Sequence, residues 1–447
     1  RFLGSSLRWN DERGRWRGKR LDPSWGGPLA RERMPWLILT AGVQTSSAKE
    51  GAAVKWASTI SERVSLNDAL DECTIAINEQ LGGQAPDLVL VFASLHHDSP
   101  DVSLAEALSA RFPEAVLVGC MGAGIIGAGH EVENGPALSL TAAVMPGVTV
   151  TPFHVSTRQL PSPDAPPDDW AELLSTSLDA GPHFILLGDP ASLDAEALLA
   201  GLDYAYPSSA KIGGFASGGR RGHALYLNGE VHREGAVGIA VSGDIVVDTV
   251  VAQGCRPIGQ PMRITEVQHN MILTMDGETP LQLLSRLYET LSSRDQELVQ
   301  RNLFMGVAMD PLLDEVRQGD FLIRNVVGID PKRGALAVGA LPREGQTVQF
   351  HVRDAETSSE DLRGTLSRYL ATAGRDAEGA LLFSCTGRGR YLYGRPDHDT
   401  GIFHEMVGVL PLGGFFCSGE IGPVAGTTYL HGYTSSFGIF RSRAGTG

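Results

Sequence analysis

Reactive and hydrogen-bonding residues gather in the segment Cys417–Pro423, which reads Cys-Ser-Gly-Glu-Ile-Gly-Pro. Glycine is dense in and around this segment, so the backbone can turn tightly and its amides can point at a ligand. Glu420 has two interpretations. Its carboxylate can accept a hydrogen bond from a ligand ammonium group, or it can tie a glycine corner to a neighbouring amide. The residue types alone leave both open.

A second polar cluster, Cys385–Gly389, follows an apolar run of strand length. Arg388 can bind a carboxylate through two parallel hydrogen bonds, and Gly389 permits a close approach of the backbone. The alternative is an exposed arginine in a tight turn. Ligands collect at the carboxyl ends of strands in α/β proteins. Arg388 and Glu420 together would match both charges of an amino acid.

The expected ligand-binding site also includes residues near these clusters and one from the first half of the chain. His96 follows another strand, in the run His96-His97-Asp98. Neighbouring residues on an extended chain point in opposite directions, so we expect His96 to line a pocket rather than to hold a metal. We expect no metal and no cofactor. The full expected site is Arg388, Gly389, Cys417, Gly419, Glu420, His431 and His96.

Thiol catalysis is the main alternative to binding. Cys417, His431 and Glu420 are the ingredients of a nucleophile, a base and an orienting group. No cysteine-enzyme signature surrounds them, and buried cysteines usually act as inert packing, so we expect a non-enzymatic protein. The run Gly122–Gly127 spells G-x-G-x-x-G, but Asn134-Gly-Pro136 would break the helix that a dinucleotide site needs, and we expect a turn there.

The hydrophobic pattern predicts alternating helices and strands. Leu66–Leu81 has the apolar spacing of an amphipathic helix, Asp87–Ser94 is a continuous apolar strand, and Ser103–Phe112 opens with a capping box. The order strand, helix, strand, glycine corner, hairpin occurs three times. The second and third copies begin at His183–Gly188 and Ala380–Cys385, and the hairpins are expected at Leu138–Met145, Val231–Val241 and Thr428–Phe440.

A different block separates the second copy from the third: a helix over Pro280–Leu291 and an antiparallel meander over 321–353. We therefore expect an α/β fold of two domains with mixed sheets, built from repeated strand-helix-strand-hairpin units. The expected domains are residues 54–255 and 256–441. A basic leader over residues 1–53, expected to be disordered, precedes them, and a tail over 442–447 follows.

Composition and charge limit the partners and the compartment. The 447 residues carry a formal charge of -15, which repels phosphate backbones, so we expect no nucleic acid partner. No stretch reaches the roughly 20 apolar residues of a membrane span, so we expect a soluble protein. Five scattered cysteines indicate a reducing compartment, the cytoplasm. The leader holds ten Lys or Arg and five Asp or Glu. It is either a transit peptide, which would direct the protein to a chloroplast or another organelle, or an upstream piece foreign to the folded body.

These segments together resemble the FIST family, whose two parts are FIST N and FIST C. The matching runs are Pro86–Ser94, Val118–Cys120, Ile212–Gly214, Gln253–Gly259, Phe350–Ala355, Phe383–Gly389, Gly414–Pro423 and Leu430–Ser435. The resemblance implies an intracellular sensory module of signal transduction that binds a small ligand, such as an amino acid, and acts on a partner protein. Some FIST proteins carry an F-box. The leader lacks the helical apolar pattern of an F-box, but an interaction scaffold related to those proteins is a further alternative.

Overall fold

The structure is a computed structural model that describes residues 8–10, 15–17, 54–97, 103–219, 223–310, 315–373 and 376–443. Of the leader it describes the paired strands β1 (Arg8–Asn10) and β2 (Arg15–Arg17). The prediction of a disordered leader therefore falls mainly on residues outside the described part, and the predicted tail lies outside it beyond residue 443.

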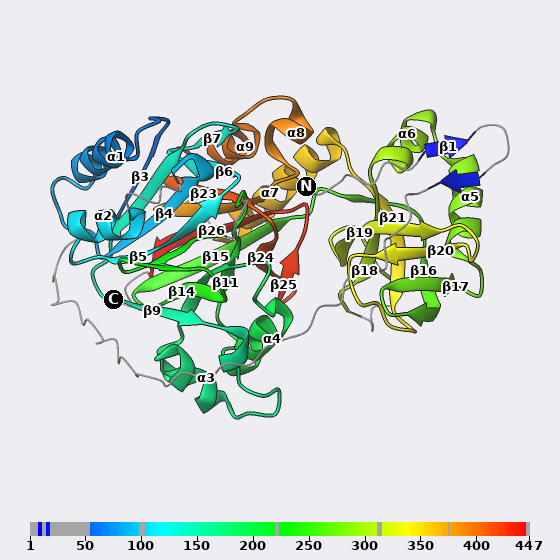
Figure 1. Cartoon of the computed structure of the whole chain (residues 1–447), viewed down its shortest axis with the longest axis horizontal. Coiled ribbons are helices and arrows are strands. Elements are labelled where there is room, and N and C mark those ends of the chain that lie inside the picture. The colour runs from blue at the N-terminus through cyan, green and yellow to red at the C-terminus, as the bar shows by residue number, and fades with distance from the viewer. Residues whose placement is uncertain are drawn as a thin grey trace. The chain divides into compact units, whose positions relative to one another are not determined.

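The chain divides into two compact units. One contains Cys255–Arg353, and the other combines Ser46–Gly254 with Asp354–Gly447 (Figure 1). This division differs from the expected segments 54–255 and 256–441. The last ninety residues pack with the first half of the chain, because their strands complete sheets that the first half begins.

The larger unit contains three copies of one strand order, each with a six-stranded mixed sheet. In each copy a lead strand is followed by two parallel strands joined by helical connections, then by a hairpin and a return strand. The return strand lies between the lead strand and the first parallel strand. The predicted α/β fold with mixed sheets and repeated units is thus confirmed.

The elements of the three copies have the following bounds. The first copy consists of β3 (Lys55–Ser61), α1 (Leu66–Gln80), β4 (Leu88–Ser94), α2 (Leu104–Arg111), β5 (Val116–Gly122), β6 (Gly124–Gly127), β7 (His130–Glu133) and β8 (Leu138–Val144). The second consists of β9 (Val148–Val155), α3 (Pro167–Leu174), β10 (His183–Gly188), α4 (Ala195–Ala205), β11 (Lys211–Phe215), β12 (Leu225–Leu227), β13 (Glu230–His232) and β14 (Ala236–Gly243). The third consists of β15 (Ile245–Ala252), α7 (Ala355–Ala373), β22 (Gly379–Cys385), α8 (Gly389–Tyr393), α9 (His398–Val407), β23 (Leu412–Cys417), β24 (Glu420–Val424), β25 (Thr427–His431) and β26 (Ser435–Ser442).

The copies exchange their hairpins in a cycle. Hairpin β6–β7 of the first copy pairs with β23 of the third, β12–β13 of the second pairs with β5 of the first, and β24–β25 of the third pairs with β11 of the second. The hairpins therefore lie earlier in the chain than predicted, directly after each glycine corner. The strands over 138–144, 236–243 and 435–442, which we expected inside hairpins, are the return strands.

A glycine occupies the same register position in the second parallel strand of every copy. A Cβ atom at Gly119, Gly213 or Gly414 would lie 1.8–1.9 Å from a carbonyl oxygen of the neighbouring parallel strand. Cβ atoms do not approach backbone that closely, so each copy requires glycine there. The repeated glycine of the sequence thus reflects the packing of paired strands.

The core of the larger unit forms where the three sheets meet. Phe92 of the first copy stacks on Phe415 of the third with ring centroids 5.0 Å apart, and Ile239 of the second belongs to the same buried cluster. Each such side chain contributes roughly 1.5–3 kcal/mol by leaving water. The helices cover the outer faces, with α1 and α2 together on one sheet, α3 and α4 on the next, and α7 and α9 on the third (Figure 1). Helices α1 and α2 begin where predicted, capped by Ser65 and Ser103.

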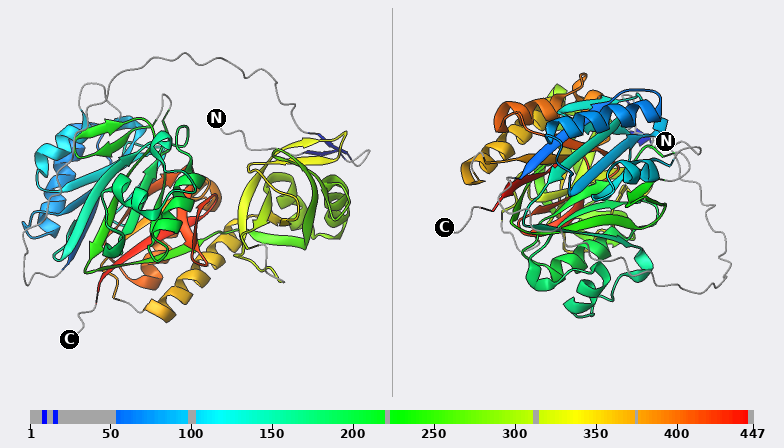
Figure 2. Two further views of the ribbon diagram at one scale, coloured as in Figure 1. Left: turned by 90° about the horizontal axis from the view of Figure 1, so that it is seen from below. Right: turned by 90° about the vertical axis from the view of Figure 1, so that its left-hand side faces the viewer.

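The smaller unit is a closed six-stranded barrel, seen end-on in the left view of Figure 2. The three strands predicted over 321–353 are present, but the predicted meander is wrong, because the strand over 347–352 pairs with those over 256–268 and 303–308 rather than with the strand over 335–338. Three further strands close the ring. Apolar side chains fill the interior. Its elements are β16 (Arg256–Gln268), β17 (Met271–Met275), α5 (Pro280–Thr290), α6 (Ser293–Arg301), β18 (Leu303–Ala308), β19 (Phe321–Asp330), β20 (Ala335–Val338) and β21 (Thr347–Val352).

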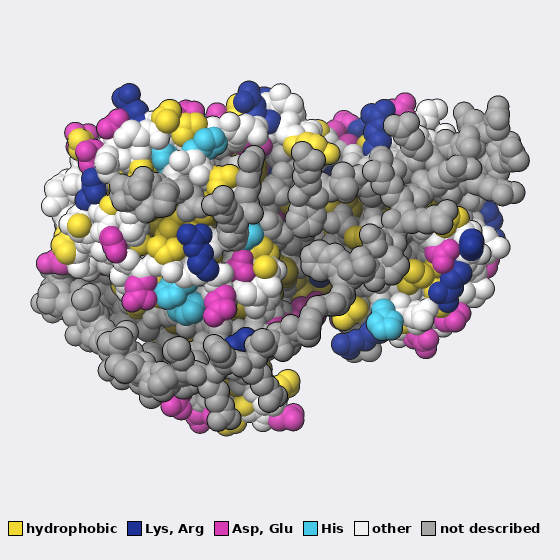
Figure 3. Space-filling model, in the orientation of Figure 1, with side chains coloured by type: hydrophobic (Ala, Val, Ile, Leu, Met, Phe, Trp, Pro, Cys, Tyr) yellow, Lys and Arg dark blue, Asp and Glu magenta, His cyan; other side chains and the backbone are white. Residues whose placement is uncertain are grey.

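In the part of the chain that the structure describes, no helix has both the length and the apolar character to cross a membrane. On the face of the larger unit drawn in Figure 3, Lys and Arg side chains are interspersed with Asp and Glu.

Candidate functional site

The polar corner of the third copy lies where the parallel strands β22 and β23 end. Their last residues, Cys385 and Cys417, are register partners. The chain then turns through Thr386 and Gly387 into the short helix α8, with Arg388 at its N-cap. Gly389 has a φ of 58°, which favours glycine at this point of the turn.

A fully buried ion pair forms the centre of this corner. Arg388 Nε donates to Asp399 Oδ2 at 2.6 Å, and Nη2 donates to Oδ1 at 3.1 Å. Neither side chain exposes more than 3% of its surface. Burial alone would raise the pKa of Asp399, but the positive charge of Arg388 and the hydrogen bonds around the carboxylate hold it well below its usual range. The pair is therefore charged across the physiological pH range.

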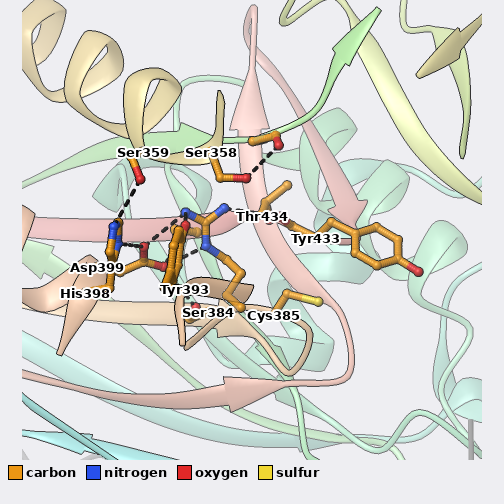
Figure 4. Close-up of polar contacts among 12 residues, drawn as sticks. Ser358, Ser359, Ser384, Cys385, Tyr393, His398, Asp399, Tyr433 and Thr434 are labelled. Carbon is orange, nitrogen blue, oxygen red and sulfur yellow. Dashed lines mark hydrogen bonds and ion pairs between the residues drawn. The ribbon is translucent and has the colours of Figure 1, made fainter. Parts of the chain in front are cut away.

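Hydroxyl groups complete the shell of this ion pair (Figure 4). Ser435 and Ser384 donate to Asp399 Oδ2 at 2.6 and 3.3 Å, and the Tyr393 hydroxyl accepts from Arg388 Nη2 at 2.6 Å. The two serines thus bond the buried carboxylate and the tyrosine bonds the buried guanidinium, as buried charges require.

His398 lies at the edge of the cluster and connects it to α7. Its ring stacks on Tyr393 with centroids 3.5 Å apart, and its Nδ1 lies 3.4 Å from Asp399 Oδ1. Its Nε2 lies 3.0 Å from Ser359 Oγ, which also bonds the carbonyl of Ala355 at 2.6 Å. The imidazole thus joins helix α7 to the start of α9.

Two acidic residues of the exchanged hairpin β6–β7 cap the helices of this corner. Glu131 accepts from the Thr400 amide at 2.9 Å, in the first turn of α9, and Glu133 accepts from the Arg390 amide at 2.8 Å, in α8. Burial, together with the nearby charge of Asp399, raises the pKa of Glu131 to about 7. The first copy therefore contributes directly to the polar corner of the third.

Two residues beside the ion pair adopt a backbone conformation that side chains other than glycine rarely take. Tyr433 has a φ of 71° and Asp397 a φ of 55°. Such conformations cost on the order of 1–3 kcal/mol each and cluster at functional sites. The Tyr433 carbonyl accepts from Arg388 Nη1 at 3.3 Å, while its ring points away from the cluster (Figure 4).

The other two copies provide an internal comparison for these polar groups. The register pair Ser384↔Ser435 corresponds to Ala93↔Leu138 in the first copy and to Gly188↔Ala236 in the second. The same strand arrangement therefore forms with apolar residues or glycine at these positions. The fold alone does not explain the buried serines and the ion pair that they contact.

Arg388 and Glu420 meet at one peptide group. Arg388 Nη1 donates to the Tyr433 carbonyl, and the amide of Thr434, in the same peptide group, donates to Glu420 Oε2 at 3.1 Å. The Thr434 hydroxyl donates to that oxygen as well, at 2.9 Å. Arg388 and Glu420, which we expected to bind the two charges of one ligand, thus contact the carbonyl and the amide of the Tyr433–Thr434 peptide. Both side chains are fully buried.

The other predicted residues of the third copy have backbone partners. The Cys417 thiol lies 3.5 Å from the Phe415 carbonyl, and His431 Nε2 lies 2.9 Å from the Gly422 carbonyl. Burial, with the nearby charge of Glu420, raises the pKa of the Cys417 thiol well above its usual value, which disfavours the thiolate that nucleophilic catalysis needs. The Gly419 carbonyl accepts from the Phe215 amide at 2.8 Å, which ties the third copy to the second.

His96 and Gly389 complete the predicted set. His96 is exposed in the 3-10 turn Leu95–His97 that ends β4, with Nδ1 3.4 Å from Ser94 Oγ, so it belongs to the first copy rather than to the third. A Cβ atom at Gly389 would lie 2.5 Å from Glu133 Oε1, which explains glycine there by packing. The turn expected at Gly122–Gly127 is wrong, because residues Gly124–Gly127 form strand β6. The run also opens no helix, which a dinucleotide site would need.

Sequence reasoning missed Asp399, His398, Tyr393 and Glu131. Asp399 lies in the first turn of a helix, where an acidic residue is ordinary, so the residue type gave no signal. Glu131 is separated from Thr400 by 269 positions, and only the pairing of β6 with β23 brings the two together. The one available signal was the run of polar residues over 395–399 close after Arg388.

Comparisons with known proteins identify two matching domains and several relatives. Residues 87–278 match the FIST N domain, and residues 280–423 match the FIST C domain. The chain is 37% identical over 382 residues to "Uncharacterized protein Rv0628c" of Mycobacterium tuberculosis, which covers 83% of this chain and 96% of the relative. It is 36% identical over 372 residues to "Uncharacterized protein Mb0898c" of Mycobacterium bovis, with 81% and 92% covered.

Proposed function

The chain belongs to the FIST family, and from that premise we propose that it is a non-enzymatic sensory protein that binds a free amino acid at the polar corner of the third copy. FIST domains are associated with sensory roles in signal transduction.

The carrying observation is the Tyr433–Thr434 peptide, whose carbonyl faces Arg388 and whose amide faces Glu420. A free amino acid presents a carboxylate and an ammonium group over a similar span, with full charges in place of the partial charges of a peptide. Charge-assisted hydrogen bonds are roughly twice as strong as neutral ones. The ligand would therefore displace this peptide, with its carboxylate on Arg388 and its ammonium group on Glu420.

The strain at Tyr433 gives the displacement a driving force. Its φ of 71° costs on the order of 1–3 kcal/mol, which is recovered when the segment moves to a relaxed conformation. Of the Arg388 hydrogen bonds described above, the bond from Nη1 to the Tyr433 carbonyl is the longest, at 3.3 Å. The bond from Nη2 to the Tyr393 hydroxyl is 2.6 Å. Binding would thus convert a strained segment into a relaxed one, and that change is the signal.

Thermal-shift screening of the full chain against the twenty amino acids, followed by titration calorimetry, tests this function. We expect at least one amino acid to bind, and Glu420→Gln to weaken its binding roughly 10–100-fold, because a hydrogen bond to a charged group contributes about 1.5–3 kcal/mol. Glu378→Gln is the matched control. The Glu378 carboxylate accepts hydrogen bonds from the amide and the hydroxyl of Ser442, just as Glu420 accepts them from the amide and the hydroxyl of Thr434.

Two results would contradict the proposal. One is the absence of binding by every amino acid, and the other is equal affinity in the Glu420→Gln and Glu378→Gln variants. The absence of turnover is tested in the same samples, in which mass spectrometry should recover the bound amino acid unchanged.

A further inference from the structure

Two cysteines lie side by side in the third copy. Cys385 and Cys417 are the last residues of the parallel strands β22 and β23 and are register partners. Residues two positions earlier on each strand, Phe383 and Phe415, pack together in the central core with ring centroids 5.9 Å apart. Side chains two residues apart share one face of a sheet, so both thiols also point to that side.

The spacing of neighbouring strands suits a covalent link between these thiols. Paired strands lie about 4.8 Å apart, within the roughly 4.4–6.8 Å that separates the Cα atoms of disulfide-bonded cysteines. Both residues are at strand ends, where the chain next turns away from the sheet.

Cys385 is the more accessible thiol of the pair. It exposes 9% of its surface, whereas Cys417 exposes none, and the next residue, Thr386, is exposed. The Gly387 amide donates to Cys385 Sγ at 3.5 Å, an interaction that favours negative charge on sulfur. In Figure 4 the Cys385 thiol points away from Asp399.

We propose that Cys385 and Cys417 are a dithiol that hydrogen peroxide oxidises to an intramolecular disulfide. The Cys385 sulfur attacks one peroxide oxygen, the O–O bond breaks, and a sulfenic acid and one water form. The Cys417 thiol then attacks the sulfenic sulfur and passes its proton to the departing oxygen in the same step, so that no free thiolate is needed, and the S–O bond breaks. The hydroxide leaves with the Cys417 proton as a second water. Two thiols and one peroxide thus give one disulfide and two waters.

This link would act on the polar corner described above. The Cys385 amide donates to the Thr434 carbonyl at 3.0 Å, and the Arg388 amide donates to the Cys385 carbonyl at 2.8 Å. The Thr386 amide donates to the Cys417 carbonyl at 3.0 Å. A disulfide would therefore fix the backbone on which Arg388 and Thr434 depend, although its formation needs no ligand.

Peptide mapping of the peroxide-treated full chain tests the proposal. The folded protein is oxidised, remaining thiols are blocked with N-ethylmaleimide, and the unreduced digest is analysed by mass spectrometry. We expect a linked peptide pair containing Cys385 and Cys417 that dithiothreitol separates. In Cys417→Ala the link should be lost, and Cys385 should accumulate as a sulfenic acid that dimedone captures. Cys73→Ala, which alters a buried thiol of α1, is the matched control and should retain the link.

Three outcomes would overturn the proposal: a link from Cys385 to another cysteine such as Cys120, full maleimide labelling of Cys385 and Cys417 after oxidation, or conversion of Cys385 to sulfinic acid in place of the disulfide. If Cys417→Ala fails to fold in a thermal melt, the mapping of the unsubstituted chain decides by itself.

Discussion

Burial of the Arg388–Asp399 ion pair costs desolvation free energy. The other two copies form the same strand arrangement with apolar residues or glycine in place of the serines that contact this pair. Removing two charges from water is compensated only by close pairing and by hydrogen bonds to the remaining lone pairs, and both are present here. Arginine and aspartate are among the residues least often fully buried. Their burial could therefore not be predicted from the sequence, which favoured Arg388 as a partner for a ligand carboxylate or as an exposed arginine in a turn.

Substitution of one member of the ion pair should destabilise the larger unit more, per residue replaced, than substitution of both members. We expect Asp399→Asn to cost about 3–5 kcal/mol in unfolding free energy, because it leaves a buried guanidinium without its counter-charge. The double variant Arg388→Met with Asp399→Asn should cost less than the sum of the single variants. Urea denaturation of the four proteins measures the coupling, and strict additivity would contradict this account.

Glu131 should make stability depend on pH. Its pKa of about 7 in the folded protein lies above its ordinary value of 4.5, so the folded state favours the protonated carboxyl. The resulting stabilisation is complete below about pH 4.5 and is lost as the pH rises through 7, a difference of about 3 kcal/mol. Relative to Glu131→Gln, the unsubstituted protein should lose this amount between pH 5 and pH 8. Urea denaturation across that range measures the loss, with Glu196→Gln as the control, because Glu196 is an exposed residue of α4. A constant difference between the two proteins would show that Glu131 ionises normally.

The glycine corners show how a single missing side chain sets the geometry of an element. Gly414 has a φ of 148°, and a Cβ there would lie 1.9 Å from the Leu382 carbonyl oxygen. No side-chain movement relieves a clash with backbone, so the two parallel strands would have to separate.

Gly414→Ala should therefore destabilise the larger unit by at least about 4 kcal/mol, among the largest effects of single substitutions. Gly401→Ala is the matched control, because a Cβ atom at this position on helix α9 would have no atom of a described residue within 4 Å beyond its own neighbours in the helix. Alanine there should be neutral or should stabilise by up to about 1 kcal/mol. Equal melting temperatures for the two variants would mean that the register glycine is not required.

Helices could be predicted from the sequence where the residues that specify them are neighbours in the chain. The helix at Leu66 and the helix at Ser103 follow from apolar spacing and a capping serine, and both are present. The hairpins were placed too late, because the corner strands over 124–133 are short and glycine-rich and resemble a turn in sequence. Their pairing partners lie in another copy, and no local pattern identifies a partner hundreds of residues away.

The two units of the chain have separate cores and are joined at one place in the strand order. The barrel is inserted between β15 and α7, where the first two copies continue directly into a helix after the lead strand. The ends of the insertion are close within the larger unit, since the Ser358 hydroxyl donates to the Gly254 carbonyl at 2.8 Å.

Replacement of residues 255–353 by a flexible linker of about six residues should leave the larger unit folded. We expect a cooperative thermal transition by circular dichroism, because the buried clusters of the three sheets include none of the barrel residues that the structure describes. The isolated barrel, residues 255–353, should melt cooperatively as well. Aggregation or loss of cooperativity in the shortened chain would show that the barrel is part of the folding unit.

Hydrogen exchange of the full chain, with and without the amino acid that binds best, locates the ligand among the three copies. We predict altered exchange in peptides that cover residues 384–400 and 417–436, including the Thr434 amide that now bonds Glu420. The equivalent corners around residues 93–97 and 188–192 should be unchanged. Altered exchange at those corners instead, or no change at Thr434 under saturating ligand, would contradict an amino acid site at the Tyr433–Thr434 peptide.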